Sequence, residues 1–185
     1  DAVMDTHEYI DDPSLECDYN HQNCQLCLTY ASKIPITNSW QSLGGNAANV
    51  AIGAKKLGLK SAILTFLGDD ANGKIIKTEL KKQKVGAGLI AVDKKAATRY
   101  SVVLNFKGER TILSYHKKRD YYFPKKLPKT DWVYYTSLSA GYEDLQSQTL
   151  SWLNRQKNIR LAYNPGSVQL KNPDEAKIVL ARADI

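Results

Sequence analysis

The fold is decided by residues 43–58, which read LGGNAANVAIGAKKLG. Two glycines open this stretch and one closes it, and the small residues between them predict a thin helix that packs closely on a sheet. The first turn of such a helix has unpaired N–H groups and a partial positive charge, so it can bind hydroxyl groups or an anion. Asn46 and Asn49 are three residues apart and are therefore neighbours on its surface. The alternative is an Ala-rich core helix with an ordinary glycine entrance.

The residues after this helix continue an alternation of strands and helices. Residues 61–67 (SAILTFL) predict a buried strand, and GDDANG at 68–73 opens a second helix over 70–84. GAG at 86–88 predicts the entrance of a further strand at 89–92. A βαβα run of this kind indicates an open, largely parallel sheet with helices on both faces. The glycines fit neither the G-x-G-x-x-G dinucleotide motif nor the G-x-x-x-x-G-K-[ST] phosphate loop.

Taken together, these motifs resemble the first signature of the PfkB carbohydrate kinases, the ribokinase-like family. The residues that carry the resemblance are G-G-N-A-A-N-V-A at 44–51, L-G at 57–58, the strand, and G-D-D-x-x-G at 68–73. The resemblance implies a ribokinase-like three-layer α/β/α fold with a mostly parallel central sheet and a small β-sheet lid. It implies lid segments at about 7–37 and 96–116, and it makes residues 1–185 the N-terminal portion of one kinase domain.

The other elements are expected from hydrophobic patterning. Residues 1–6 predict the end of a first strand, and loose alternation over 7–36 predicts two or three short antiparallel strands. A β-hairpin is expected farther along, with strands at 98–106 and 109–115 and a turn between them. The last part of the chain predicts a strand at 131–136, a helix with the apolar stripe Leu145, Thr149, Trp152 and Leu153, a strand at 159–163, and a helix beginning at Pro173.

The composition is that of an ordinary globular protein of one domain, with 185 residues, 43% hydrophobic and 24% charged. No apolar run is long enough to span a membrane, and we expect no signal peptide. Three cysteines are an odd number, which suits a reducing cytoplasm better than a disulfide framework. The net charge of +7 comes from scattered lysines without interleaved aromatic residues, so we expect neither nucleic acid nor a membrane as a partner.

The resemblance also implies sugar-binding residues. In the family the first strand ends in an acidic residue that binds sugar hydroxyls, and Asp5 matches that position; a carboxylate accepts two hydroxyl hydrogen bonds well. The helix entrance adds Gly44, Gly45 and Asn49, where glycine would let a ligand approach the backbone without a Cβ in the way. Thr98 also matches, although it could be purely structural. Because ligands of open α/β sheets bind at the carboxyl ends of the strands, we expect Asp5 and Asn49 to face one pocket.

The segment 17–27 (CDYNHQNCQLC) is unlike the best-known sugar kinases. Cys24 and Cys27 have the spacing of zinc ligands, and Cys17 and His21 could complete a tetrahedral site for Zn²⁺ or another thiophilic metal. The second half of a normal zinc motif is absent from the sequence. Free thiols in a loop, or a dimer contact, are therefore the alternative.

We expect no catalytic residue in this chain. In the family, a later part carries the ATP pocket, the Mg²⁺ contacts and a Gly-Ala-Gly-Asp motif whose Asp is the catalytic base. GAG at 86–88 is followed by Leu89 and comes far too early to be that motif. The sequence is therefore interpreted as the sugar-binding half of a kinase, truncated after Ile185 and expected to be inactive alone.

Three classes of function stay open at this point. The resemblance implies ATP-dependent phosphorylation of a sugar, or of a nucleoside such as adenosine, by a protein that could form a homodimer through the β lid. The second class is a non-catalytic module that binds a sugar or nucleoside and lacks the ATP half. The third, a thiol–metal or nucleic-acid-binding protein, rests only on the cysteine segment and the basic charge.

Overall fold

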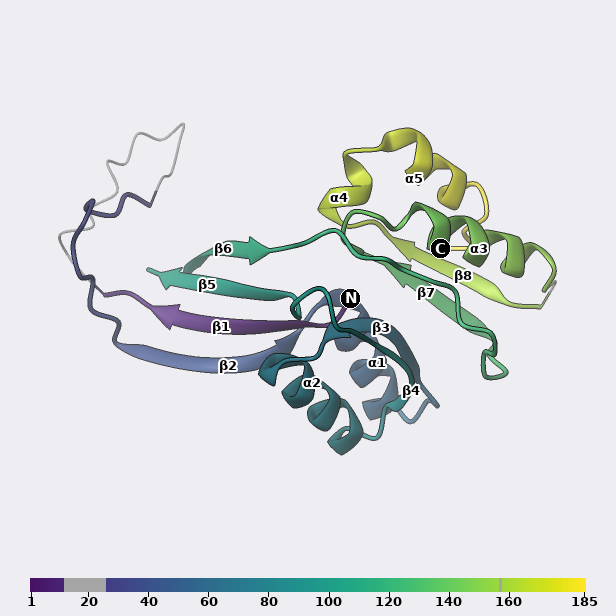
Figure 1. The fold of residues 1–185 in the computed structure, drawn as a ribbon, viewed down its shortest axis with the longest axis horizontal. Coiled ribbons are helices and arrows are strands. Elements are labelled where there is room, and N and C mark those ends of the chain that lie inside the picture. Colours follow the sequence, from purple (N-terminus) through teal and green to yellow (C-terminus); the bar gives the residue numbers. More distant parts are fainter. Residues whose placement is uncertain (12–25, 157) are drawn as a thin grey trace.

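The computed structural model describes residues 1–11, 26–156 and 158–185. Figure 1 shows a four-stranded sheet that projects from a body in which helices flank two pairs of strands. The elements in chain order are β1 Val3–Tyr9, β2 Asn38–Gly44, α1 Asn46–Lys56, β3 Ala62–Gly68, α2 Ala71–Lys82, β4 Gly86–Asp93, β5 Tyr100–Phe106, β6 Glu109–Tyr115, β7 Trp132–Thr136, α3 Glu143–Asn154, β8 Arg160–Asn164, α4 Ser167–Leu170 and α5 Pro173–Leu180.

The projecting sheet has the strand order β2-β1-β5-β6. Strand β1 pairs antiparallel with β2 on one side and parallel with β5 on the other. Strands β5 and β6 form a hairpin, and its turn residues Lys107 and Gly108 have φ angles of 48° and 83°. Two positive φ angles in succession are typical of the two-residue turns that match the twist of the flanking strands. The hairpin predicted from the sequence is therefore confirmed.

The body contains two parallel strand pairs with helices beside them. Strand β3 pairs with β4 next to α1 and α2, and β7 pairs with β8 next to α3 and α5. In Figure 1 the first two helices lie below the strands and the last helices lie above them, as in a three-layer α/β/α fold. The predicted fold class is confirmed, although the described parallel strands of the body form two separate hydrogen-bonded pairs. None of the described helices is long and apolar enough to cross a membrane.

Two apolar cores fix these layers. One core joins Met4 at the start of β1 to Ala48 of α1 and Ile76 of α2, and the other joins β3, β7, β8 and α3 around Leu153 and Leu161. Full burial of a large apolar side chain stabilises the fold by about 1.5–3 kcal/mol. Because Met4 is anchored between the helices, the position of the next residue, Asp5, is set by the first core.

The structure differs from the sequence prediction between residues 7 and 44. Residues 7–9 continue β1 and residues 26–37 contain no strand, so the short strands predicted over 7–36 are wrong for the described part of that range. Strand β2 was missed, because its sequence NSWQSLG is mostly polar. It forms because every one of its residues pairs with β1, a contact between distant parts of the chain that local propensity does not report.

Candidate functional site

Asp5 lies against Gly44 near the end of the projecting sheet that joins the body. We call this end the foot of the sheet and the opposite end its tip. Its carboxylate covers the position of the missing side chain, because a Cβ on Gly44 would come within 1.9 Å of Oδ2 of Asp5. A larger residue at position 44 would therefore displace the carboxylate. Gly45 follows as the N-cap residue of α1. The structure thus brings together three of the predicted sugar-binding residues, Asp5, Gly44 and Gly45, beside the start of a helix.

Helix α1 begins without the acceptors that usually cap a helix. Its N-cap glycine provides no side-chain hydrogen bond, and its first turn contains no acidic residue. The side-chain amide of Asn46 donates to Oγ1 of Thr136 at 3.4 Å, which joins the start of α1 to the end of β7. The positive end of the α1 dipole is therefore not compensated within its own first turn, which suits an acceptor such as a hydroxyl oxygen or an anion.

Gly45 is required by the packing of β1. Its φ angle is 88°, and a Cβ at this position would lie 2.4 Å from the carbonyl oxygen of Asp1 and 3.2 Å from Cα of Ala2. The sequence suggested that this glycine keeps space for a ligand beside its Cα. That interpretation is corrected here, because the start of β1 fills the space.

Asn49 lines a cavity of about 570 Å³ between α1, α2 and β2. Met4 and Leu43 contribute apolar surface to this cavity, and Glu79 contributes a carboxylate. Asp5 does not line it. Met4 and Asp5 are consecutive in β1 and point to opposite faces of the sheet. The described structure therefore does not bring Asn49 and Asp5 into one cavity.

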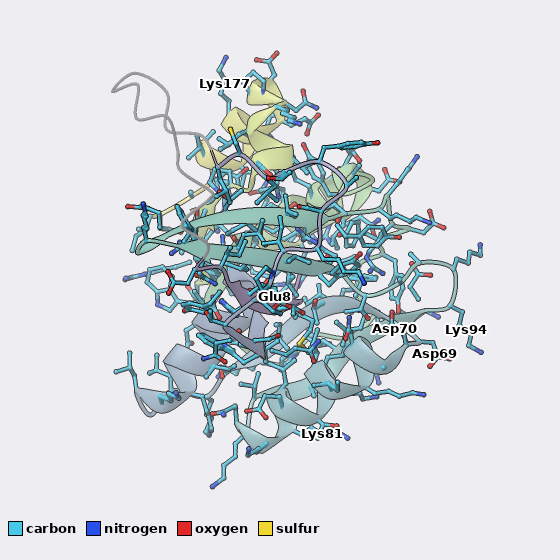
Figure 2. The ribbon with its side chains drawn as sticks, turned by 90° about the vertical axis from the view of Figure 1, so that its left-hand side faces the viewer. Glu8, Asp69, Asp70, Lys81, Lys94 and Lys177 are labelled. Carbon is cyan, nitrogen blue, oxygen red and sulfur yellow. The ribbon has the colours of Figure 1, made fainter. Side chains whose placement is uncertain are left out.

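Thr98 makes several contacts within the protein. Its hydroxyl donates to Oδ1 of Asp70 at 2.7 Å and accepts from the N–H of Gly68 at 2.8 Å. Its backbone N–H donates to Oδ2 of Asp70 at 2.7 Å. Asp70 also caps α2 by accepting from the N–H of Gly73 at 2.8 Å, and Figure 2 shows Asp70 at the edge of the molecule. We call these four residues the Asp70–Thr98 clasp; it ties β3 and α2 to the foot of β5.

Breaking the Asp70–Thr98 clasp is expected to lower the free energy of unfolding. Thr98→Val preserves the shape of the side chain but leaves the N–H of buried Gly68 without its acceptor, which costs about 1–3 kcal/mol. Thr98→Ser keeps the hydroxyl and should cost less. The matched control is Thr78→Val on the exposed side of α2, expected to change stability by less than about 0.5 kcal/mol. Urea unfolding followed by circular dichroism measures all three, and wild-type stability of Thr98→Val would contradict the expectation.

The same clasp should make stability depend on pH. Partial burial alone would raise the pKa of Asp70, but hydrogen bonds from Thr98 and Gly73 outweigh it and hold the pKa below the ordinary value of 3.8. A carboxyl whose pKa is lowered by folding stabilises the protein above its unfolded pKa, and this contribution is lost as the pH falls through the folded pKa. The stability difference between wild type and Asp70→Asn should therefore shrink below about pH 4. A difference that stays constant in unfolding experiments across that range would refute this.

A buried charged junction at the foot of β1 was not predicted. The carboxylate of Asp1 lies 3.6 Å from Nη1 of Arg99 and accepts a hydrogen bond from the hydroxyl of Tyr121. Arg119 lies 3.5 Å from the carboxylate of Asp93. The two arginines are only 6% and 2% exposed, and buried charges persist only where they are paired. They flank the hairpin in the sequence, but only the fold shows that they turn inward.

The predicted zinc ligands are mostly outside the structure. Cys17, His21 and Cys24 lie outside the described residues, and Cys27 is exposed. The described part of the chain contains no group of three or more His, Cys, Asp or Glu side chains that could hold a metal ion. The zinc site therefore stays a prediction from cysteine spacing.

Comparison with known proteins identifies relatives over most of the chain. Residues 14–179 match the family model described as pfkB family carbohydrate kinase. The chain is 30% identical over 155 residues to a fructokinase of Klebsiella pneumoniae, covering 77% of this chain and 50% of that protein. It is 38% identical over 76 residues to the 5-dehydro-2-deoxygluconokinase of Bacillus licheniformis, covering 40% of this chain and 23% of that protein. The match thus spans half the length of the fructokinase and about a quarter of the length of the 5-dehydro-2-deoxygluconokinase.

Solved structures agree on the fold. The Arabidopsis thaliana ribokinase complexed with ribose and ATP superposes with a TM-score of 0.67 at 16% identity, covering 88% of this chain and 50% of that chain. At this identity the similarity establishes the fold alone. The architecture of the described residues is therefore that of about half of a ribokinase-fold chain.

Proposed function

The chain belongs to the pfkB family of carbohydrate kinases, and on this basis we propose that it supplies the sugar-binding half of an enzyme that phosphorylates a sugar with ATP. The arrangement of Asp5 carries the proposal. Its carboxylate is held over Gly44 beside the start of α1, whose own first turn contains no acidic residue, so a strong acceptor lies next to a helix N-terminus. A polyol needs both acceptors and donors, because each of its hydroxyls can donate and accept a hydrogen bond.

Four of the predicted residues have distinct roles in this proposal, whereas Gly45 serves the packing of β1. Asp5 accepts hydrogen bonds from neighbouring sugar hydroxyls, and the first N–H groups of α1 donate to sugar oxygens. Gly44 leaves the space that the carboxylate occupies. For Asn49 to contact the sugar, its side chain must turn from the cavity between α1, α2 and β2 toward the start of α1. Thr98 acts indirectly, through the Asp70–Thr98 clasp.

The phosphoryl chemistry is assigned to residues other than these. ATP with Mg²⁺ supplies the transferred group in kinases of this kind. We assign no metal contact to the described residues, which contain no cluster of three potential ligands. The catalytic base and the nucleotide contacts are likewise proposed to come from another segment, because residues 1–185 contain no Gly-Ala-Gly-Asp motif.

Partners and location form part of the same proposal. A homodimer through the projecting sheet is supported by its outer strands β2 and β6, each of which pairs on one side only among the described residues. Trp40 on β2 and Leu113 on β6 are 42% and 55% exposed. Unpaired edges and exposed apolar side chains favour association. A cytoplasmic location is kept as a prediction from the sequence.

The test is a ligand screen followed by an activity assay. A sugar that binds only the folded protein raises its melting temperature, by an amount equivalent to about 2.7 kcal/mol at a hundred times its Kd. We expect fructose or a gluconate-derived sugar acid to raise it, and the natural full-length protein to release ADP when the same sugar and ATP–Mg²⁺ are present. Binding without ADP release would support the non-catalytic module instead. A response to adenosine alone would support a nucleoside kinase, and no response to any ligand would contradict the proposal.

A further inference from the structure

Four polar side chains form a row across the projecting sheet. Asp5 is paired with Ser42 on β2 and with Ser101 on β5, and Ser101 is paired with Ser114 on β6. Residues paired across neighbouring strands point to the same face of a sheet. Neighbouring strands are about 4.8 Å apart. The carboxylate of Asp5 therefore has one serine on each side of it, and a third lies one strand farther along the same face; we call these four residues the polar row.

The polar row lies between an aromatic pair and an arginine–histidine pair on that face. Two residues toward the tip of the sheet, His7 is paired with Trp40, and the two rings stack with centroids 5.2 Å apart. Toward the foot, Nη2 of Arg99 lies 3.3 Å from Nε2 of His116. A half-exposed aromatic ring beside hydroxyl and carboxylate groups suits a ligand with an apolar face and a polar rim, as a sugar ring has.

The serines complement the carboxylate chemically. An ionised carboxylate can only accept hydrogen bonds, whereas a serine hydroxyl both donates and accepts. Oγ of Ser42 already lies 3.1 Å from Nε2 of His7, which fixes its direction. Ser101 is 6% exposed, so a hydrogen bond from its hydroxyl to a ligand would be shielded from water. When a ligand hydroxyl is bound to Asp5, the Ser101 hydroxyl on β5 is thus within reach of the ligand, as both a donor and an acceptor.

We propose that Ser101 is a specificity-determining residue of the sugar site and that the polar row binds adjacent hydroxyls of one sugar molecule. The proposal rests on the proposed function and deepens it, because it assigns one row of residues across the projecting sheet to the substrate. Ser101 selects ligands that carry a hydroxyl next to the one bound by Asp5. A deoxy sugar that lacks this hydroxyl loses the interaction.

The neighbouring contacts hold this row in register. Thr98 and Arg99 directly precede β5, and each is fixed to the body, Thr98 by Asp70 and Arg99 by Asp1. The carbonyl of Arg99 also accepts from the N–H of Met4 at 3.0 Å, which locks β5 to β1 one residue before Asp5. Because a slip of one residue would turn every side chain to the other face, these contacts keep Ser101 beside Asp5.

The test is isothermal titration calorimetry with fructose, using wild type, Ser101→Ala and the matched control Ser39→Ala. Ser39 is an exposed serine that pairs with Glu8, so it points to the opposite face of the same sheet. We expect Ser101→Ala to weaken fructose binding about three- to tenfold, the loss of one hydrogen bond, and Ser39→Ala to bind like wild type. Ser101→Thr, which keeps the hydroxyl, should retain more affinity than Ser101→Ala.

The outcomes separate this inference from the function on which it rests. Equal affinity of Ser101→Ala and Ser39→Ala, together with weakened binding by Asp5→Ala, would overturn the role of Ser101 and leave the sugar site in place. Absence of fructose and sugar-acid binding by wild type would overturn both. Melting temperatures of the variants show whether they fold. If Ser101→Ala does not fold, wild-type binding decides: we expect fructose to bind more tightly than a deoxy sugar that lacks the neighbouring hydroxyl, and equal affinity for the two would overturn the assignment.

Discussion

Asp5→Ala is expected to weaken sugar binding about tenfold to hundredfold and to leave the KM for ATP in the active enzyme nearly unchanged. The half-buried carboxylate is the strongest acceptor on its face of the sheet, and removing it leaves bound hydroxyls unpaired at a cost of about 1–3 kcal/mol. Each 1.4 kcal/mol corresponds to about a tenfold change in affinity. Calorimetric titration with the sugar found in the ligand screen measures the effect.

The control for this variant is Asp11→Ala. Asp11 is an exposed aspartate just beyond the end of β1, so its removal changes the net charge equally without touching the proposed site. We expect it to bind the sugar like wild type. If Asp5→Ala spared the sugar and weakened ATP instead, the wrong half of the active site would have been assigned to this chain.

Gly45→Val is expected to destabilise the whole fold by about 3 kcal/mol or more. A non-glycine residue in the left-handed region costs about 1–3 kcal/mol, and forcing extra carbon atoms into a packed site costs about as much again. Here the φ angle is 88°, and the new Cβ would lie 2.4 Å from the backbone of Asp1. The variant should unfold at lower urea concentration and at lower temperature than wild type, or fail to fold.

The matched control for Gly45→Val lies in the same helix. Gly53 is inside α1, and a Cβ there would meet nothing within 4 Å. Gly53→Ala should therefore stabilise the protein by about 0.5–1 kcal/mol, because alanine loses less conformational freedom in a helix. Wild-type stability of Gly45→Val would show that the start of β1 can move away from α1 without cost.

The parts of the fold that depend on local pattern could be predicted from the sequence. Helix α1 was expected over 44–58 and spans Asn46–Lys56, because its glycine boundaries and small residues are local signals. The same holds for the hairpin, whose alternating residues and glycine turn determine it. Strand β2 was missed, because only its pairing with β1 makes a polar segment a strand.

The candidate site was predictable only in part, and for the same reason. Motif order pointed to Asp5 and Gly44, and the structure brings them into contact. The shared pocket of Asp5 and Asn49 was inferred from general α/β architecture, which does not specify the face of β1 on which each side chain lies. The polar row depends on the register of four strands from distant parts of the chain, and single-sequence patterns carry no information on that register.

Thr98 was predicted to contact the sugar, whereas the structure shows it in contacts within the protein. Its place in the motif order matched a family sugar contact, whereas its hydroxyl both donates to Asp70 and accepts from Gly68. The sequence indicated that GDDANG opens a helix, but the partner that Asp70 binds beyond this helix lies 28 residues away. The sequence could therefore predict the start of α2 and not the contact with Thr98 before β5.

The most direct test of the central claim is hydrogen–deuterium exchange of the protein with and without the sugar found in the ligand screen. We expect the sugar to slow exchange of backbone amides at residues 3–7, 43–48 and 99–103, which are the foot of β1, the start of α1 and the start of β5. Exchange in β7, β8 and α5 should stay unchanged. Protection confined to residues 132–180, with none around Asp5, would contradict the assignment of the sugar site to this end of the sheet.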